Sequence, residues 1–317
     1  MIFRDLSARG GRAHFYAFFN RIRLERGRRC DIISCMTAIK LENVCYAYEA
    51  DGDKAAVNAV DGVSLEIEEG AFVAVVGHNG SGKSTLARLL NGLLLPDKGS
   101  VTVFGTDTRD EKNIYNVRSS VGMVFQNPDN QMVASVVEDD IAFGPENLGL
   151  QREEIIRRVD WALEQVGMSE YRKSTPFRMS GGQKQRLAIA GVLAIRPKVL
   201  VLDESTAMLD PKGRREVMDV IHALNKREKM SVIHITHYME EVLEADRVIV
   251  MDGGRIALDD APHAVFARGA ELKKFRLAPP AVTLIADALA ECGADIPRSV
   301  TTEEELEEAI CRSLSKD

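Results

Sequence analysis

One stretch of the chain carries glycines, a lysine and hydroxyl side chains at a spacing suited to holding phosphate. Its residues are Gly77, His78, Asn79, Gly80, Ser81, Gly82, Lys83, Ser84 and Thr85. They fit the pattern G-x-x-x-x-G-K-[ST], in which glycines let backbone N–H groups close around phosphate oxygens. Lys83 would contact the β- and γ-phosphates, and the Ser84 hydroxyl would hold Mg²⁺. The stretch predicts a phosphate loop, and a glycine-rich surface turn is the alternative.

Two acidic residues, Asp203 and Glu204, follow a hydrophobic run 120 positions after Lys83. We expect Asp203 to hold Mg²⁺, in part through water, because Mg²⁺ keeps several waters of its hydration shell. Glu204 would orient or deprotonate the water that attacks the terminal phosphate, an effect of about 10²–10⁴ in rate. Surface charges that cap a helix are the alternative, which the upstream phosphate loop disfavours.

A second candidate for anion binding lies at the start of an expected helix. Its residues are Ser180, Gly181, Gly182 and Gln183. A hydroxyl and small residues at a helix N-terminus favour negative charge. One γ-phosphate cannot easily be held by two helix starts of the same chain, so we expect this run to serve a nucleotide on another subunit. An ordinary serine N-cap is the alternative.

Apolar patterning indicates the elements that position these residues. Residues 72–76, 199–202 and 231–236 are short apolar runs, each ending directly before a candidate residue or loop. Residues 84–94 and 151–167 have helical character. Strands that alternate with helices predict an α/β fold with a parallel sheet covered on both faces, and ligands bind beyond the carboxyl ends of such strands.

The tail of the chain has a different pattern. Val282, Ile285 and Leu289 share one helical face, and Thr302 with Glu305 forms a capping box ahead of further apolar residues at helical spacing. A small helical appendage is expected.

Composition excludes several classes of protein. No apolar run reaches the ~18 residues of a membrane-spanning helix. The formal charge of −7 argues against broad nucleic-acid binding. Five cysteines without a Cys-x-x-Cys pair suit a reducing compartment rather than a disulfide framework.

The first part of the chain is basic, with eight arginines against three acidic residues in residues 1–35. This segment lacks a long apolar core and a small-residue cleavage site. We expect a loosely ordered extension, for which a start codon assigned too early is one origin, and a targeting peptide or functional arm is the alternative. Residues 36–262 should form the nucleotide-binding domain and residues 263–317 a C-terminal helical segment.

The order of the motifs resembles the ATP-binding-cassette (ABC) family over about residues 38–260, most specifically in residues 180–183. The resemblance implies a RecA-like phosphate-loop core with a β-rich N-terminal part, a helical subdomain at about residues 127–183 and a small C-terminal helical appendage. It also implies ABC ATPase activity with ATP and Mg²⁺.

Further site residues follow only from this resemblance. Tyr48 matches the aromatic residue that stacks on adenine, and Gln126 matches the glutamine that reaches Mg²⁺ and the attacking water. Asp210 matches the D-loop aspartate, and His237 the histidine that contacts the γ-phosphate. Without the family, Tyr48 is a strand aromatic beside Tyr46, and His237 is a capping residue at a strand end.

A closer resemblance is to the ATPase subunits of energy-coupling-factor (ECF) transporters, which import vitamins and transition-metal ions. It rests on residues 126–131, 137–147 and 302–306. The combination is similar to the first of two paired paralogues, also named cobalt-import ATPases, whose tail joins the two ATPases. Two features depart from the family pattern without removing a catalytic group. They are the extension of residues 1–35 and the sequence Ala207-Met208 before Leu209.

This resemblance implies a set of partners at the cytoplasmic face of the cell membrane, where the chain would be peripheral. They are a second ATPase subunit (a paralogue or a second copy), an integral membrane coupling protein and a separate substrate-binding membrane protein, with no nucleic acid. Two ATPases would face head to tail, each ATP held between residues 77–85 of one and 180–183 of the other. No residue indicates the transported substrate.

The acidic run from Glu138 to Asp140 is a candidate docking site for arginines of the membrane partner. A solvated helix start, in which the helix dipole favours acids, is the alternative.

Two other functions compete with transport. A soluble ABC ATPase acting on ribosomes or DNA usually has two cassettes or a coiled-coil insertion, whereas only 53 residues without sustained heptads separate Gln126 from Ser180. A small-molecule kinase has no need for residues 180–183.

Overall fold

The computed structural model describes residues 36–49, 57–297 and 300–314, and the predicted basic extension lies outside these residues. From Met36 onward the described residues belong to one compact unit. Within these ranges, none of the helices combines the length and the apolar character needed to cross a membrane.

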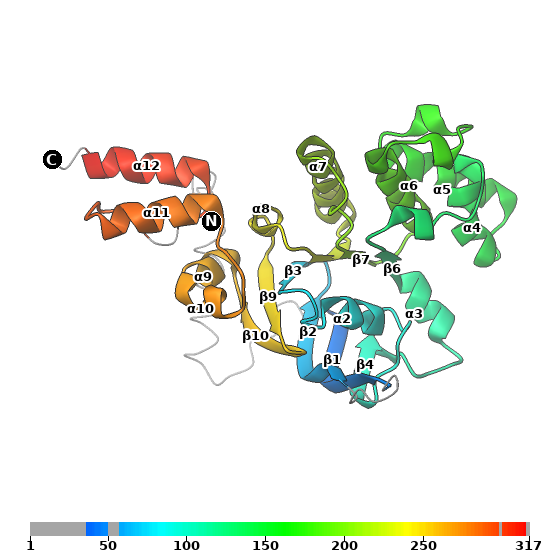
Figure 1. Cartoon of the computed structure of the whole chain (residues 1–317). Helices are drawn as coiled ribbons and strands as arrows, with labels where there is room; N and C mark the ends of the chain where they lie inside the picture. The colour runs from blue at the N-terminus through cyan, green and yellow to red at the C-terminus, as the bar shows by residue number, and fades with distance from the viewer. Residues whose placement is uncertain (1–35, 50–56, 298–299, 315–317) are drawn as a thin grey trace, which may run out of the picture. The chain divides into compact units, whose positions relative to one another are not determined.

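The central sheet of the described residues has six strands in the order β10-β9-β3-β8-β7-β6 (Figure 1). Its strands are β3 (Phe72–Val76), β6 (Val121–Val124), β7 (Val199–Asp203), β8 (Ser231–Ile235), β9 (Arg247–Asp252) and β10 (Arg255–Asp260). All neighbours pair in parallel except β10, which runs antiparallel to β9 at the edge. Strands β3, β7 and β8 are buried at every position, as expected for strands covered on both faces. The predicted α/β fold with a parallel-sheet core is confirmed.

A second, antiparallel sheet has four strands in the order β2-β1-β4-β5. They are β1 (Thr37–Tyr48), β2 (Val57–Glu68), β4 (Lys98–Val103) and β5 (Thr106–Asp107). This sheet is the expected β-rich N-terminal part of the fold.

The alternation of side chains along β3 joins two hydrophobic cores. Val73 and Val75 pack into a cluster with the antiparallel sheet and the first described helix. Phe72, Ala74 and Val76 point to the other face and join a cluster with the helices between residues 137 and 274. Because successive side chains of a strand point to opposite faces, one five-residue strand holds both layers in place.

Helices cover both faces of the central sheet. They are α2 (Lys83–Leu90), α3 (Ile114–Ser120), α7 (Pro211–Glu228) and α8 (Met239–Val242). Helix α2 is shorter than the predicted 84–94, because Asn91 ends it and Gly92 turns away with a φ of 69°. The apolar residues that continue its pattern, Leu93 and Leu95, are exposed.

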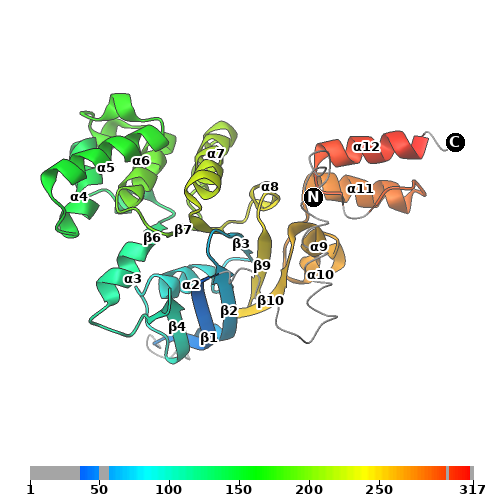
Figure 2. The same ribbon diagram turned by 180° about the vertical axis from the view of Figure 1, so that it is seen from behind.

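A helical group lies beyond the β6 edge of the sheet, as both ribbon views show (Figures 1 and 2). It contains α4 (Val137–Asn147), α5 (Arg152–Gln165) and α6 (Gly181–Leu193), which pack against one another. The short 3₁₀ turns η1 (Pro128–Asn130), η2 (Ser169–Tyr171) and η3 (Pro176–Arg178) connect it. Helix α5 agrees with the predicted 151–167, and α6 extends past residue 183.

Four helices end the described chain: α9 (Pro262–Phe266), α10 (Gly269–Lys274), α11 (Ala281–Glu291) and α12 (Glu303–Leu314). The predicted capping box forms, since Thr302 Oγ1 accepts from the Glu305 N–H at 3.2 Å and the Glu305 carboxylate accepts from the Thr302 N–H at 3.3 Å. Val282 and Leu289 pack on a small core around Ala286. Ile285, expected on the same helical face, is 50% exposed.

Candidate nucleotide-binding site

The loop of residues 77–85 connects β3 to α2 and approaches other backbone too closely for side chains. A Cβ atom on Gly82, whose φ is 102°, would lie 2.2 Å from the Ala59 carbonyl oxygen. One on Gly77 would lie 2.4 Å from the Met251 carbonyl oxygen. The glycines of the motif are therefore required by the space around the loop as well as by their conformation.

The lysine of this loop is held inside it. Lys83 is 4% exposed, and its Nζ donates to the carbonyl oxygens of Gly77 at 2.8 Å and His78 at 3.0 Å. Burial lowers the pKa of Lys83, and the charges of Glu204 and Asp203 oppose this shift. The fully buried Ser81 Oγ has no hydrogen-bond partner among the described residues. A buried cation and an unpartnered hydroxyl fit a phosphate group.

The candidate metal residues meet at the carboxyl end of β7. Ser84 Oγ donates to Asp203 Oδ1 at 2.9 Å. Burial raises the pKa of Asp203, the Ser84 hydrogen bond opposes this, and the Glu204 charge adds to it. A hydroxyl and a carboxylate are oxygen ligands of the kind Mg²⁺ prefers. In the described residues no three His, Cys, Asp or Glu side chains gather as a metal site.

Three other predicted site residues surround the carboxylate of Glu204. Its Oε2 accepts a hydrogen bond from Gln126 Nε2 at 3.2 Å and lies 3.9 Å from His237 Nδ1. Its Oε1 lies 3.9 Å from Lys83 Nζ. These side chains follow β6, β7, β8 and β3, so the carboxyl ends of four parallel strands supply them. Glu204 itself has a φ of 49°, an uncommon conformation for a residue other than glycine.

Of the two tyrosines at the end of β1, Tyr48 is the exposed one. Its side chain is 42% exposed, and its hydroxyl shares a hydrogen bond of 3.3 Å with Thr85 Oγ1. Tyr46 contacts it edge to face at 5.1 Å and packs against the core. Tyr48 is thus the ring that is accessible next to the phosphate loop.

Sequence reasoning missed one residue that holds the loop, Asp252 at the end of β9. His78 Nε2 lies 2.9 Å from Asp252 Oδ1, and His78 Nδ1 lies 2.7 Å from the Asn79 carbonyl oxygen. Asn79 and Gly80 form the exposed tip of the loop. The available signal was an acidic residue at the end of an apolar strand, directly before two glycines.

The second anion-binding candidate begins α6 with a capping box formed by two of its own residues. Ser180 Oγ accepts from the Gln183 N–H at 3.3 Å, and Gln183 Oε1 accepts from the Ser180 N–H at 3.0 Å. A Cβ on Gly181 would lie 3.8 Å from the Met208 carbonyl oxygen, which places this helix start beside the 205–210 turn. In the described part of the chain no hydrogen bond joins residues 180–183 to residues 77–85.

Asp210 begins α7, where its Oδ1 accepts from the Gly213 N–H at 2.9 Å. It is exposed, as is Met208, at 59%. The predicted D-loop aspartate therefore also acts as a helix cap.

The acidic docking candidate is wrong as a continuous surface. Asp140 is buried, and its Oδ1 accepts from the N–H groups of Val133 at 2.7 Å and Ala134 at 2.9 Å. Glu138 is paired with Lys173 and Arg172, whose hydrogen bonds hold its pKa below the usual value. Only Asp139 of the three acids is exposed. Asp140 is bound by backbone N–H groups and Glu138 by neighbouring cations, so neither carboxylate is available to arginines of a membrane partner.

Comparison with known proteins agrees with this geometry. Residues 60–207 match the ABC transporter family. An energy-coupling factor transporter ATP-binding protein EcfA1 from Caldanaerobacter subterraneus is 53% identical over 274 residues, covering 86% of this chain and 99% of its own length. EcfA1 from Symbiobacterium thermophilum is 54% identical over 281 residues, 88% of this chain and 98% of its own. The chain belongs to the ECF-transporter ABC ATPases.

Solved structures place this ABC ATPase among the same relatives. The chain is similar to cbiO1 from Clostridium perfringens, described as part of the ABC transporter complex cbiONQ, with a TM-score of 0.67 and 39% identity over 75% of this chain and 94% of that one. A dimeric structure of MJ0796, a bacterial ABC transporter cassette, has a TM-score of 0.64 and 28% identity over 71% and 98%. The predicted ABC ATPase activity and ECF resemblance are confirmed, and the ribosome or DNA alternative is not favoured.

Proposed function

We propose that this ABC ATPase energises an ECF-type importer of vitamins or transition-metal ions by closing with a second ATPase subunit around ATP and reopening after hydrolysis. The observation that carries the proposal is the separation of its two anion-binding helix starts. Residues 77–85 surround a buried cation, whereas residues 180–183 lie beside the 205–210 turn and share no hydrogen bond with that loop among the described residues. Each is half of a site that two subunits complete.

The side chains around Glu204 divide the work of hydrolysis. Lys83 and the loop N–H groups bind the β- and γ-phosphates. Glu204 orients the attacking water and takes its proton, Gln126 holds the Glu204 carboxylate in place through its amide, and His237 contacts the γ-phosphate. Their distances of 3.2–3.9 Å from the Glu204 oxygens support one concerted site.

Ser84, Asp203 and Gln126 would hold Mg²⁺. Bound there, the ion neutralises charge on the phosphate oxygens. Tyr48 would stack on the adenine, for which its exposed ring beside Thr85 is suited. Asp210, at the start of α7, would act at the dimer contact.

The γ-phosphate explains how hydrolysis changes conformation. A ligand shifts a two-state equilibrium only by its difference in affinity for the two states. ATP held by residues 77–85 of one subunit and 180–183 of the other stabilises the closed dimer, and loss of the γ-phosphate removes that difference. The dimer reopens and moves its membrane partner.

We propose as partners a paralogue or second copy of this chain, an integral coupling protein and a substrate-binding membrane protein, at the cytoplasmic face of the membrane. The EcfA1 names of the relatives and the cbiONQ description of a structural neighbour support this assembly. Residues 263–317 would contact the second ATPase, for which Leu284 and Ile285 of α11 are 42% and 50% exposed.

The test is the oligomeric state of Glu204→Gln with saturating MgATP, both alone and mixed with a paralogue. Light scattering and crosslinking measure it. We expect a dimer that is absent without nucleotide. The matched control, Lys83→Ala in the same background, should dimerise less at the same MgATP concentration because it holds the phosphates more weakly. A Glu204→Gln protein that stays monomeric both alone and with the paralogue would overturn the proposal.

A further inference from the structure

A buried carboxylate outside the nucleotide site gathers three hydrogen bonds on one oxygen. Glu241, in α8, is 8% exposed. Its Oε2 accepts from Thr206 Oγ1 at 3.0 Å, from Thr236 Oγ1 at 2.6 Å and from His234 Nε2 at 2.8 Å. No step of the proposed hydrolysis uses this group.

The network holds the carboxylate in its charged form. Burial alone would raise the pKa of Glu241, but the hydrogen bonds from His234, Thr236 and Thr206 outweigh it and keep the pKa below the usual value. The three donors are no more than 1% exposed. Hydrogen bonds to an ionised acceptor are shorter and about twice as strong as neutral ones. Glu241 is therefore a firm anchor for the segments that carry its donors.

Those segments are the two that flank the reacting groups. Thr206 lies two residues after Glu204, and Thr236 directly precedes His237. The Tyr238 N–H also donates to Thr236 Oγ1 at 3.0 Å. One carboxylate oxygen thus joins the turn that leaves Glu204 to the turn that carries His237.

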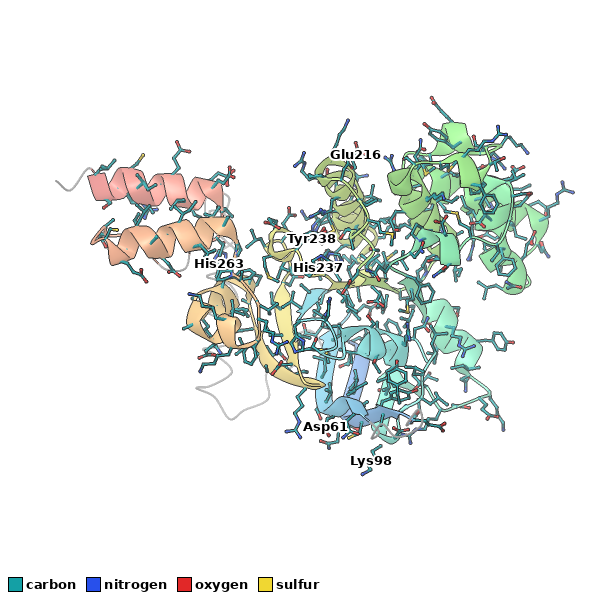
Figure 3. The ribbon with its side chains drawn as sticks, viewed as in Figure 1. Asp61, Lys98, Glu216, His237, Tyr238 and His263 are labelled. Carbon is teal, nitrogen blue, oxygen red and sulfur yellow. The ribbon has the colours of Figure 1, made fainter. Side chains whose placement is uncertain are left out.

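A second layer joins the same two turns. The Arg214 guanidinium lies 3.5 Å from the centre of the Tyr238 ring and donates to the Leu209 carbonyl oxygen at 3.4 Å. The Tyr238 hydroxyl donates to the Ala207 carbonyl oxygen at 3.5 Å, and its ring lies 4.2 Å from that of His237. Figure 3 shows His237 and Tyr238 next to each other beside α8.

The two layers meet at an incomplete ion pair. Arg214 Nε lies 3.8 Å from Glu241 Oε1, and neither atom has a hydrogen-bond partner among the described residues. The charge of Glu241 therefore acts on the side chain that holds the Leu209 carbonyl. The same turn lies next to Gly181 at the start of α6, where a Cβ would lie 3.8 Å from the Met208 carbonyl oxygen.

We propose that Glu241 is a positioning residue that ties the 205–210 turn to the 236–238 turn, so that Glu204, Asp210 and His237 reach the nucleotide as one unit. The proposal rests on the roles given to Glu204 and His237 above. A merely structural network would stabilise the fold without linking the motions of the two turns.

The experiment compares Glu241→Gln, which keeps the size but removes the charge, with Thr206→Val, which removes one donor without changing the shape. Asn225→Ala is the matched control, because Asn225 of α7 donates its hydrogen bonds to the carbonyl oxygens of Gly70 at 3.0 Å and Met230 at 2.8 Å, which lie outside the two turns. Steady-state ATPase kinetics and hydrogen–deuterium exchange are measured on each full-length protein.

In Glu241→Gln we expect kcat to fall by about tenfold or more, since displacements near 1 Å can cost 10²-fold, while KM for MgATP changes less than threefold. Amides in residues 205–210 and 236–238 should exchange faster together. Thr206→Val should show the same pattern more weakly, and Thr206→Ser should restore kcat. Asn225→Ala should lower stability without either effect.

A kcat that falls only as much as in Asn225→Ala, or faster exchange confined to one of the two turns, would overturn the tie. The exchange result decides this without reference to catalysis. Turnover retained by Glu204→Gln would instead remove the proposed site roles, so the two failures are distinguishable.

Discussion

The two glycine-rich helix starts of this chain differ in how far each is prepared for phosphate. At α2, Lys83 is buried with a lowered pKa and Ser81 Oγ has no partner in the described residues. At α6, the capping box satisfies the N–H groups of Ser180 and Gln183, and the cation of the first turn, Lys184, is paired with Asp129 at 2.6 Å.

This contrast implies an order of events. The α2 site has a buried cation and an unpartnered hydroxyl that the phosphates of ATP can contact within one subunit. The α6 site offers the N–H groups of Gly181 and Gly182, which the capping box does not use, and the partial positive charge of a helix start, roughly half an elementary charge. It can add affinity only after the first site has placed a γ-phosphate in front of it. Binding should therefore precede closure, and the two sites should respond differently to substitution.

The largest effect is expected at the chemical step. Glu204→Gln keeps the hydrogen bond from Gln126 but cannot take a proton, so turnover should fall by about 10²–10⁴-fold while ATP still binds. A single-turnover phosphate-release assay measures it. Turnover within a factor of a few of the unmodified protein would remove Glu204 from its role.

Breaking the α2 site should come next. Lys83→Ala removes a charge-assisted contact of ~1.5–3 kcal/mol, which corresponds to roughly 10–100-fold weaker ATP binding by a single subunit. Calorimetric titration below the dimerisation concentration measures it. Unchanged affinity would show that the loop N–H groups suffice, and the contrast between the two helix starts would lose its basis.

Breaking the α6 site should leave that titration unchanged. Ser180→Ala removes an N-cap worth about 1 kcal/mol and one contact to the partner's nucleotide. We expect the loss of that contact, about 1.4 kcal/mol, to weaken ATP-dependent dimerisation in the Glu204→Gln background. This energy corresponds to a factor of roughly ten. If instead ATP binding by the isolated subunit weakens, residues 180–183 serve the same subunit's nucleotide.

The smallest expected effect is on the stability of the protein without nucleotide, which the buried carboxylate of Asp203 lowers. Because burial raises the pKa of Asp203, the folded state binds more protons than the unfolded state between the usual value of 3.8 and the raised one, so this residue's contribution to stability falls as pH rises through that window. Asp203→Asn should raise the melting temperature at pH 7 by about 1–3 °C. The gain should vanish below pH 3.8.

Thermal unfolding without Mg²⁺ or nucleotide, at several pH values, measures this shift. Glu241 provides the opposite sign in the same experiment. Its pKa is lowered, so its contribution is present above pH 4.5 and is lost as pH falls through the folded value. A melting temperature lowered at pH 7 by Asp203→Asn would contradict the expected cost.

Much of the site was predictable because its signals are local. A β-branched run ending at Gly77 predicts a strand entering a tight turn, and hydroxyl and lysine residues after it predict the loop. The capping boxes at Ser180 and Thr302 involve residues three apart, which a helix start brings together by itself. Helix ends were less predictable, since Leu93 and Leu95 continue the pattern of α2 after Gly92 has turned the chain.

Only the tertiary structure decided which of these residues act together. The strand order β3-β8-β7-β6 brings Gln126 and His237 to Glu204, and residues 180–183 lie beside the 205–210 turn. It also buries Asp140 and Glu241, which the sequence presents as ordinary surface acids. Sequence periodicity determines which face of an element is apolar, because that depends on neighbouring residues. The partner of a charge depends on strands and helices far apart in the chain, whose pairing no local pattern encodes.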